Sequence, residues 1–70
     1  MEQEYLVTYS IYLDCGLYGV KEELIEAESE EDARKQAEDI ADKMEALILA
    51  KSGGRYEDVW VAIDSIEAEN

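Results

Sequence analysis

Carboxylates are the side chains with which this sequence could do chemistry. Seven of them lie between Glu22 and Asp32, and no lysine or arginine interrupts that stretch. Two carboxylates can act as general acid and base when a sheltered pocket moves their pKa values apart. The chain contains no histidine, the usual general base and the commonest metal ligand. A catalytic role would therefore need a fold that shelters these acids.

Motifs for other chemistry are missing. No serine or cysteine has a histidine partner, and no carboxylate loop has the spacing of a calcium site. The segment "KSGGR" (residues 51–55) has two glycines and basic flanks, but phosphate-binding loops precede a helix and this segment follows a predicted one. It is better interpreted as a helix end. We expect a protein that is not an enzyme and that needs no cofactor and no metal.

Length and charge restrict the classes of partner. The 70 residues predict a single domain, residues 1–70, in which a small core leaves little room for a deep cavity. A hydrophobic fraction of 47% is enough for folding. Nineteen acidic and six basic residues give a net charge of −13, which opposes contact with nucleic acid or with anionic lipid. We expect neither direct nucleic-acid binding nor membrane binding.

Cysteine usage and hydropathy favour a cytoplasmic location. Cys15 is the single cysteine, so no intramolecular disulfide is expected, as suits a reducing compartment. No apolar run approaches the roughly 20 residues of a membrane span. The charged start at residues 1–4 is unlike a signal peptide.

Alternation of residue types predicts three strands. In "EYLVTYSIYLD" (residues 4–14) the odd positions are the more apolar and should face the core. "DCGLYG" supplies a hairpin connection that is not a clean two-residue turn. A second strand follows over residues 18–28, where the adjacent Leu24 and Ile25 suggest a bulge near Glu23. The last strand lies in "EDVWVAIDSIEAE" (residues 57–69).

A helix is predicted over residues 30–50. Ser29 is a good N-cap, and the acids of the first turn, Glu30, Glu31 and Asp32, are explained by the positive end of the helix dipole. "KSGG" ends the helix with glycine just beyond a basic residue. One apolar stripe recurs at helical spacing. Its members are Ala33, Ala37, Ile40, Ala41, Met44, Leu47 and Ile48.

The order of elements predicts an α+β fold of ββαβ type. The first strand is the most apolar and belongs in the middle, and a right-handed crossover places the third strand on its other side. We therefore expect a three-stranded antiparallel sheet of order 2-1-3, with one helix on one face and the second face open. A single helix on such a sheet offers little shelter for catalytic carboxylates.

Acids also cover the predicted outward side of the helix. Glu31, Glu38, Asp42 and Glu45 fall within about 60° of one another, opposite the apolar stripe. A solvated helix is ordinarily charged on its outside, but it usually mixes both signs. We therefore interpret the outward and second-strand acids as a partner-binding set. That set is Glu22, Glu23, Glu26, Glu28, Glu31, Glu38, Asp39, Asp42 and Glu45.

The open sheet face is a second candidate surface. The residues expected on it are Leu6, Thr8, Ser10, Tyr12, Leu24, Trp60 and Ala62. Exposed aromatic and aliphatic side chains in a small domain indicate a contact surface. Leu6, Tyr12, Leu24 and Trp60 would therefore meet a second copy or another partner. The alternative is that the phase of the third strand is inverted and that Trp60 belongs to the core.

One segment carries a resemblance. "LIEAESEEDARKQAEDIA", with Ser29, Glu30, Glu31, Ala33 and Ala37, resembles small acidic proteins of phages and mobile elements, including anti-CRISPR and anti-restriction inhibitors that imitate nucleic acid. The resemblance implies a non-catalytic inhibitor that acts in the cytoplasm of a bacterial host. Its acidic surface would bind the basic nucleic-acid channel of a defence complex. The alternative is a dimeric structural or regulatory module similar to an antitoxin domain, although the proline- and glycine-containing strand motif of those domains is absent.

Overall fold

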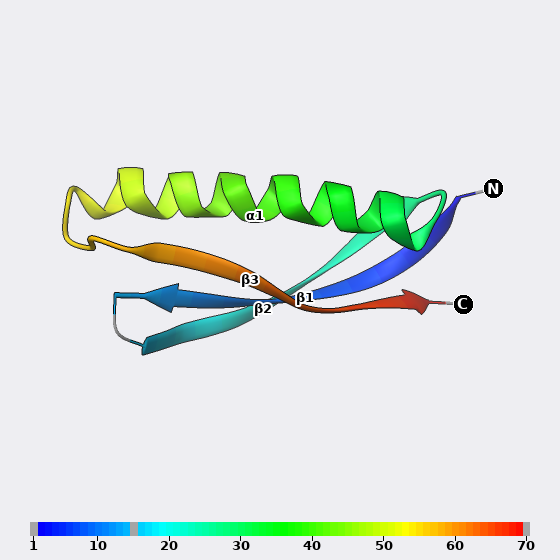
Figure 1. Cartoon of the computed structure of the whole chain (residues 1–70), viewed down its shortest axis with the longest axis horizontal. Coiled ribbons are helices and arrows are strands. Elements are labelled where there is room, and N and C mark those ends of the chain that lie inside the picture. Colours follow the sequence, from blue (N-terminus) through cyan, green and yellow to red (C-terminus); the bar gives the residue numbers. More distant parts are fainter. Residues whose placement is uncertain (1, 15, 70) are drawn as a thin grey trace.

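The computed structural model describes residues 2–14 and 16–69. The elements are β1 (Gln3–Leu13), β2 (Gly16–Ala27), α1 (Glu30–Ser52) and β3 (Val59–Glu69). The strands form one antiparallel sheet of order β2-β1-β3, and α1 covers one face (Figure 1). The predicted ββαβ fold is confirmed. Cys15 lies outside the described residues.

The molecule is long and thin. Its backbone measures 43 × 18 × 14 Å along its principal axes, and α1 runs along most of the long axis (Figure 1). Both chain ends lie at one end of the molecule, whereas the β1–β2 hairpin and the α1–β3 connection lie at the other. We call these the terminal end and the hairpin end. Among the described residues, no helix has the length and apolar character needed to cross a membrane.

The core lies between the central strand and α1. Odd-numbered residues of β1 point towards the helix, as predicted, and Tyr5, Val7 and Tyr9 are buried. The helix meets them with small side chains, which let its backbone approach the sheet closely. The other buried apolar residues are Ile25, Ala27, Ala33, Ala37, Ala41 and Val61. The core therefore pairs large side chains on the sheet with alanines on the helix.

Both helix ends have the expected caps. Ser29 has extended backbone angles, and its Oγ accepts a hydrogen bond of 3.1 Å from the Asp32 N–H. The Asp32 carboxylate in turn accepts a 3.4 Å bond from the Glu28 N–H, which fixes the chain that enters the helix. Gly53 ends α1 in the left-handed region, with φ of 62°. The helix continues to Ser52, two residues beyond the predicted end.

The bulge predicted near Glu23 is wrong. Tyr5 pairs with Ile25 and Leu6 with Leu24, so the two adjacent apolar residues of β2 face opposite sides of a regular strand. The register of β2 shifts instead opposite Ile11 and Tyr12, where Tyr18 is left without a partner in β1. A second shift lies in β3 at Asp64, opposite Thr8 and Tyr9.

Asp14 ties the hairpin to the start of β3. Its Oδ1 accepts hydrogen bonds from the N–H groups of Glu57 (2.9 Å) and Asp58 (3.0 Å). Its own N–H donates to the Asp58 carbonyl oxygen at 2.9 Å. The backbone of Asp14 has φ of 47°, a conformation that aspartate and asparagine tolerate better than most residues. One side chain thus joins two connections that are far apart in sequence.

We expect Asp14→Ala to lower the free energy of unfolding by about 1 kcal/mol, because two backbone donors lose their acceptor. In a domain of this size that loss corresponds to a fall in Tm of roughly 4–8 °C. Asp14→Asn keeps an acceptor oxygen at the same position and should lose less than half as much. Equal losses in thermal unfolding would show that the hydrogen bonds to Oδ1 do not stabilise the fold.

The hydroxyl of Tyr9 is buried and has no hydrogen-bond partner among the described residues. Burial raises the pKa of this phenol above its ordinary value of 10.0, and the negative charge of Glu23 raises it further. The folded state therefore holds the Tyr9 proton more tightly than the unfolded chain does. Stability must then fall as the pH rises above about 10, where the unfolded state begins to release this proton.

Tyr9→Phe should leave the free energy of unfolding at pH 7 unchanged or slightly increased, since the variant removes an unpaired buried hydroxyl. It should also lose less stability than the wild-type protein between pH 8 and pH 10.5. Urea unfolding of both proteins at the two pH values measures the difference. An identical alkaline loss in the two proteins would contradict the assignment to Tyr9.

Candidate protein-binding surface

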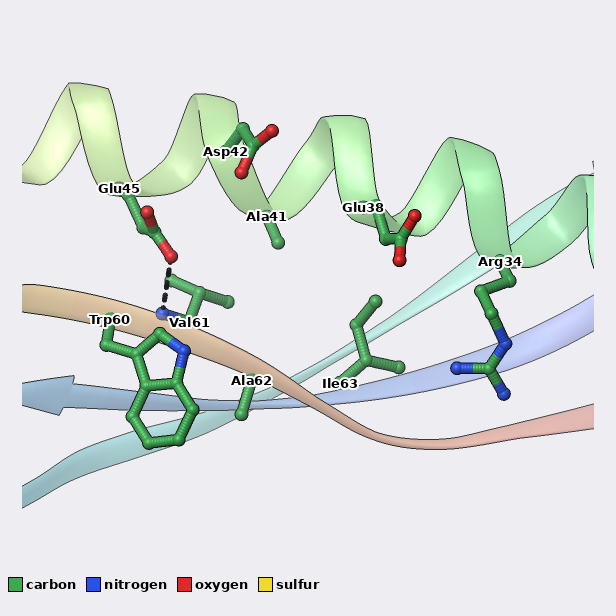
Figure 2. A pocket seen from close by; sticks show the side chains of 9 residues that line it. All are labelled: Arg34, Glu38, Ala41, Asp42, Glu45, Trp60, Val61, Ala62 and Ile63. Carbon is green, nitrogen blue, oxygen red and sulfur yellow. Dashed lines mark hydrogen bonds between the residues drawn. The ribbon is translucent and has the colours of Figure 1, made fainter.

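A row of charged side chains on α1 lies along β3. Arg34, Glu38, Asp42 and Glu45 are three or four residues apart and so share one side of the helix. With residues 60–63 of β3 they line a groove between α1 and the strand (Figure 2). Among the described residues that line the groove, Arg34 is the only cation. The groove is therefore acidic over most of its length.

Glu45 was predicted on the outward side of the helix, and this prediction is wrong. It is half-buried, and its Oε2 accepts a 2.9 Å hydrogen bond from the Val61 N–H (Figure 2). At 100° per residue, Glu45 is only about 40° from the buried Ala41, so it borders the core stripe. β3 is an edge strand, and the carboxylate satisfies a backbone donor that would otherwise face outwards.

Glu38 and Asp42 are exposed in the same groove. In Figure 2 Glu38 points from α1 towards β3, and Asp42 lies one turn further along the same side of the helix. Unlike Glu45, neither carboxylate accepts a hydrogen bond from any of the described residues. These two acids are available to an external cation, whereas Glu45 has a structural role.

The other predicted acids are divided among different sides of the molecule. Glu22 and Glu26 pair with Thr8 and Glu4, which places them on the sheet face that α1 leaves uncovered, here called the open face. Glu23 pairs with Val7 on the opposite, helix-covered face and is half-buried. The remaining three are exposed on the β2–α1 connection or on α1: Glu28, Glu31 and Asp39. The predicted set of nine therefore does not form one surface.

Aromatic side chains lie on the open face, and the structure places Leu6, Tyr12, Leu24 and Trp60 there, as predicted. The rings of Tyr12 and Trp60 stack with centroids 5.1 Å apart and planes at 26°. Trp60 is 60% exposed and projects away from α1 (Figure 2). The alternative in which Trp60 belongs to the core is therefore wrong.

Two further apolar residues of the open face were missed. Leu17 pairs with Tyr12 and Val20 with Ser10, and their side chains are 59% and 60% exposed. The expected start of the strand at residue 18 excluded Leu17, and the expected bulge broke the alternation beyond it. Every second residue of a strand lies on the same face, so Val20 and Glu22 share a face with Leu24. This alternation could have identified Val20 as a residue of the open face.

Leu47 was predicted in the core stripe but is 57% exposed. The sheet twists, whereas α1 is straight, and β2 lies away from the helix at the hairpin end (Figure 1). Leu47 thus borders a shallow apolar hollow with Ile11, Met44 and Ile48, at the rim of which lie Lys21 and Lys51.

The acidic side chains of the described residues are spread over the surface. Among residues 2–14 and 16–69, no three acidic side chains come close enough together to hold a metal ion. Comparison of the chain with protein-family models, with curated proteins and with solved structures finds no significant match. Function is therefore inferred from the charge and the geometry of the surface.

Glu45→Ala should lower the free energy of unfolding by about 1–2 kcal/mol, because the Val61 N–H loses a charged acceptor at a half-buried site. Asp42→Ala, at an exposed position of the same row, should change it by less than about 0.5 kcal/mol. Glu45→Gln retains an acceptor oxygen and should lie between the two. Chemical denaturation measures all three, and equal effects of Glu45→Ala and Asp42→Ala would refute a structural role for Glu45.

Proposed function

We propose that this protein is a non-catalytic inhibitor whose negative surface binds the basic nucleic-acid-binding channel of another protein. Carboxylates take the positions of phosphates, and lysine and arginine residues of the partner supply the attraction. The partner belongs to a bacterial defence complex, in keeping with the resemblance of residues 24–41 to small phage inhibitors, and the interaction takes place in the host cytoplasm.

The observation that carries this proposal is the charge per unit length. Thirteen net negative charges over a long axis of 43 Å amount to one per about 3.3 Å. Duplex DNA carries one charge per about 1.7 Å of its axis, which is one per about 3.4 Å for each strand. Averaged along its length, the protein has the charge density of a nucleic-acid strand. Solubility alone requires much less net charge in a small domain.

The placement of the acids supports binding over catalysis. Glu38 and Asp42 on α1 and Glu22 and Glu26 on β2 are exposed, so a partner can reach them without any rearrangement of the fold. Exposed carboxylates lack the shelter that acid–base catalysis requires. Since these residues lie on different sides of a thin molecule, a channel that encloses the protein would contact more of them than a flat surface would.

A second candidate function is a dimeric interaction module similar to an antitoxin domain. The stacked Tyr12–Trp60 pair, in which Trp60 is exposed, favours it, because an aromatic patch is typical of a protein contact. In that case the sheet residues would carry the function and the acids of α1 would contribute little.

Binding can be tested by capture from a bacterial lysate on the immobilised protein at low salt. We expect captured proteins to elute as the salt concentration rises, because the contacts join charged surfaces. They should also elute with single-stranded or duplex DNA at constant salt, because both ligands occupy one channel. A captured protein that binds nucleic acid and this chain together, with full affinity for each, would contradict the proposal.

Charge variants test which acids contribute. Glu38→Lys combined with Asp42→Lys should weaken binding to the captured protein by roughly 10- to 100-fold, since it replaces attraction by repulsion. The matched control, Glu38→Gln with Asp42→Asn, removes the charges without reversing them and should have a smaller effect. Equal affinity of all three proteins in a binding titration would show that the α1 groove does not take part.

A further inference from the structure

The open face changes in chemistry along its length. At the terminal end, the strand register brings Glu26, Glu4 and Glu69 into one row across the three strands. At the hairpin end, the corresponding row is Leu17, Tyr12 and Trp60. Eight residues of β1 separate the two rows, or about 26 Å at the rise of a strand. The face therefore has an acidic end and an aromatic end.

The aromatic end resembles a short stack of bases. Tyr12 and Trp60 lie on neighbouring strands with their rings stacked, and the Trp60 side chain is 60% exposed. A ring that is held by a neighbour on one side and exposed on the other can receive a further planar group. Aromatic pairs that stack gain energy beyond that of the area they bury.

The charge of this face selects its partner. Fifteen positions are paired across the three strands on this side of the sheet, and none of these described residues is lysine or arginine. A second copy would bring five more glutamates, at positions 4, 22, 26, 67 and 69, and no cation to meet them. A partner that covers the whole face must be basic at one end and aromatic or apolar at the other.

We infer that the open face fits a groove that binds single-stranded nucleic acid, with its glutamates in place of phosphates and the Tyr12–Trp60 pair in place of bases. The inference rests on the proposed function and names the kind of channel. Single-strand sites combine a basic groove with aromatic side chains on which bases stack. Duplex-binding surfaces instead contact phosphates and base edges, because the bases are already stacked within the helix.

Competition with defined oligonucleotides tests the inference. The captured partner is bound to the wild-type protein and titrated with oligo(dT), with an abasic oligonucleotide of the same length, and with a duplex of that length. We expect oligo(dT) to displace the protein at concentrations at least about tenfold lower than either competitor requires, because it alone offers both phosphates and unstacked bases.

Variants at Trp60 test the aromatic contact. Trp60→Ala and Trp60→Leu should each weaken binding to the partner by about tenfold or more, whereas Trp60→Phe should retain most of the affinity, because stacking needs a planar ring. Leu47→Ala is the matched control, since it removes an equally exposed apolar side chain from the helix-covered side. Circular dichroism and Tm confirm that each variant is folded.

The two proposals fail in different ways. If duplex DNA displaces the protein as well as oligo(dT) does, or if Trp60→Leu binds like the wild type, the single-strand inference is overturned and the proposed function stands. If no nucleic acid displaces the protein, both are overturned. Sedimentation of the protein alone tests whether a second copy of the chain covers the open face. A wild-type dimer that Trp60→Ala converts to monomers, with unchanged affinity for the partner, would assign the face to a second copy.

Discussion

The fold depends on the contact between one stripe of alanines and the large side chains of the central strand. Ala33, Ala37 and Ala41 are buried in one cluster with Tyr5, Val7 and Tyr9, and the other buried apolar residues of the described chain belong to the same cluster. A larger residue at any of the three alanines would force the helix away from the sheet. Because the chain has one helix, it can cover one face of the sheet and no more.

The open face and the exposed acids follow from that constraint. A core with nine buried apolar residues among those described has to offset the mutual repulsion within a chain of net charge −13. The structure limits this cost by placing nearly all of its carboxylates at the surface, and the half-buried Glu45 is bonded to a backbone donor. Neither the excess of negative charge nor the exposed Trp60 adds to the stability of the fold, and both belong to the binding surface that is proposed above.

Local patterns in the sequence were sufficient for the fold. The alternation in β1, the N-cap at Ser29 and the exposed phase of Trp60 each depend on a few neighbouring residues, and the structure confirms them. The roles of Asp14 and Glu45 depend instead on which strand lies at the edge of the sheet and on how the two connections meet. The exposure of Leu47 depends on the sheet twist, and the places where the register shifts depend on how the strands pair. Sequence periodicity contains no information about the sheet twist or the register shifts. The candidate acids could therefore be identified by residue type but not assigned to sides of the molecule.

The central position of β1 has a consequence for synthesis on the ribosome. β1 can pair with β2 as soon as both have emerged, but its other edge pairs with β3, which follows α1 in the chain. Until β3 is released, the backbone groups along that edge of β1 have no strand beside them, and the Glu45 carboxylate lacks the Val61 donor. A nascent chain that stalls before residue 59 therefore exposes an unpaired strand edge, the feature by which partly folded chains associate. The sheet of this protein is complete only when β3 has paired with β1.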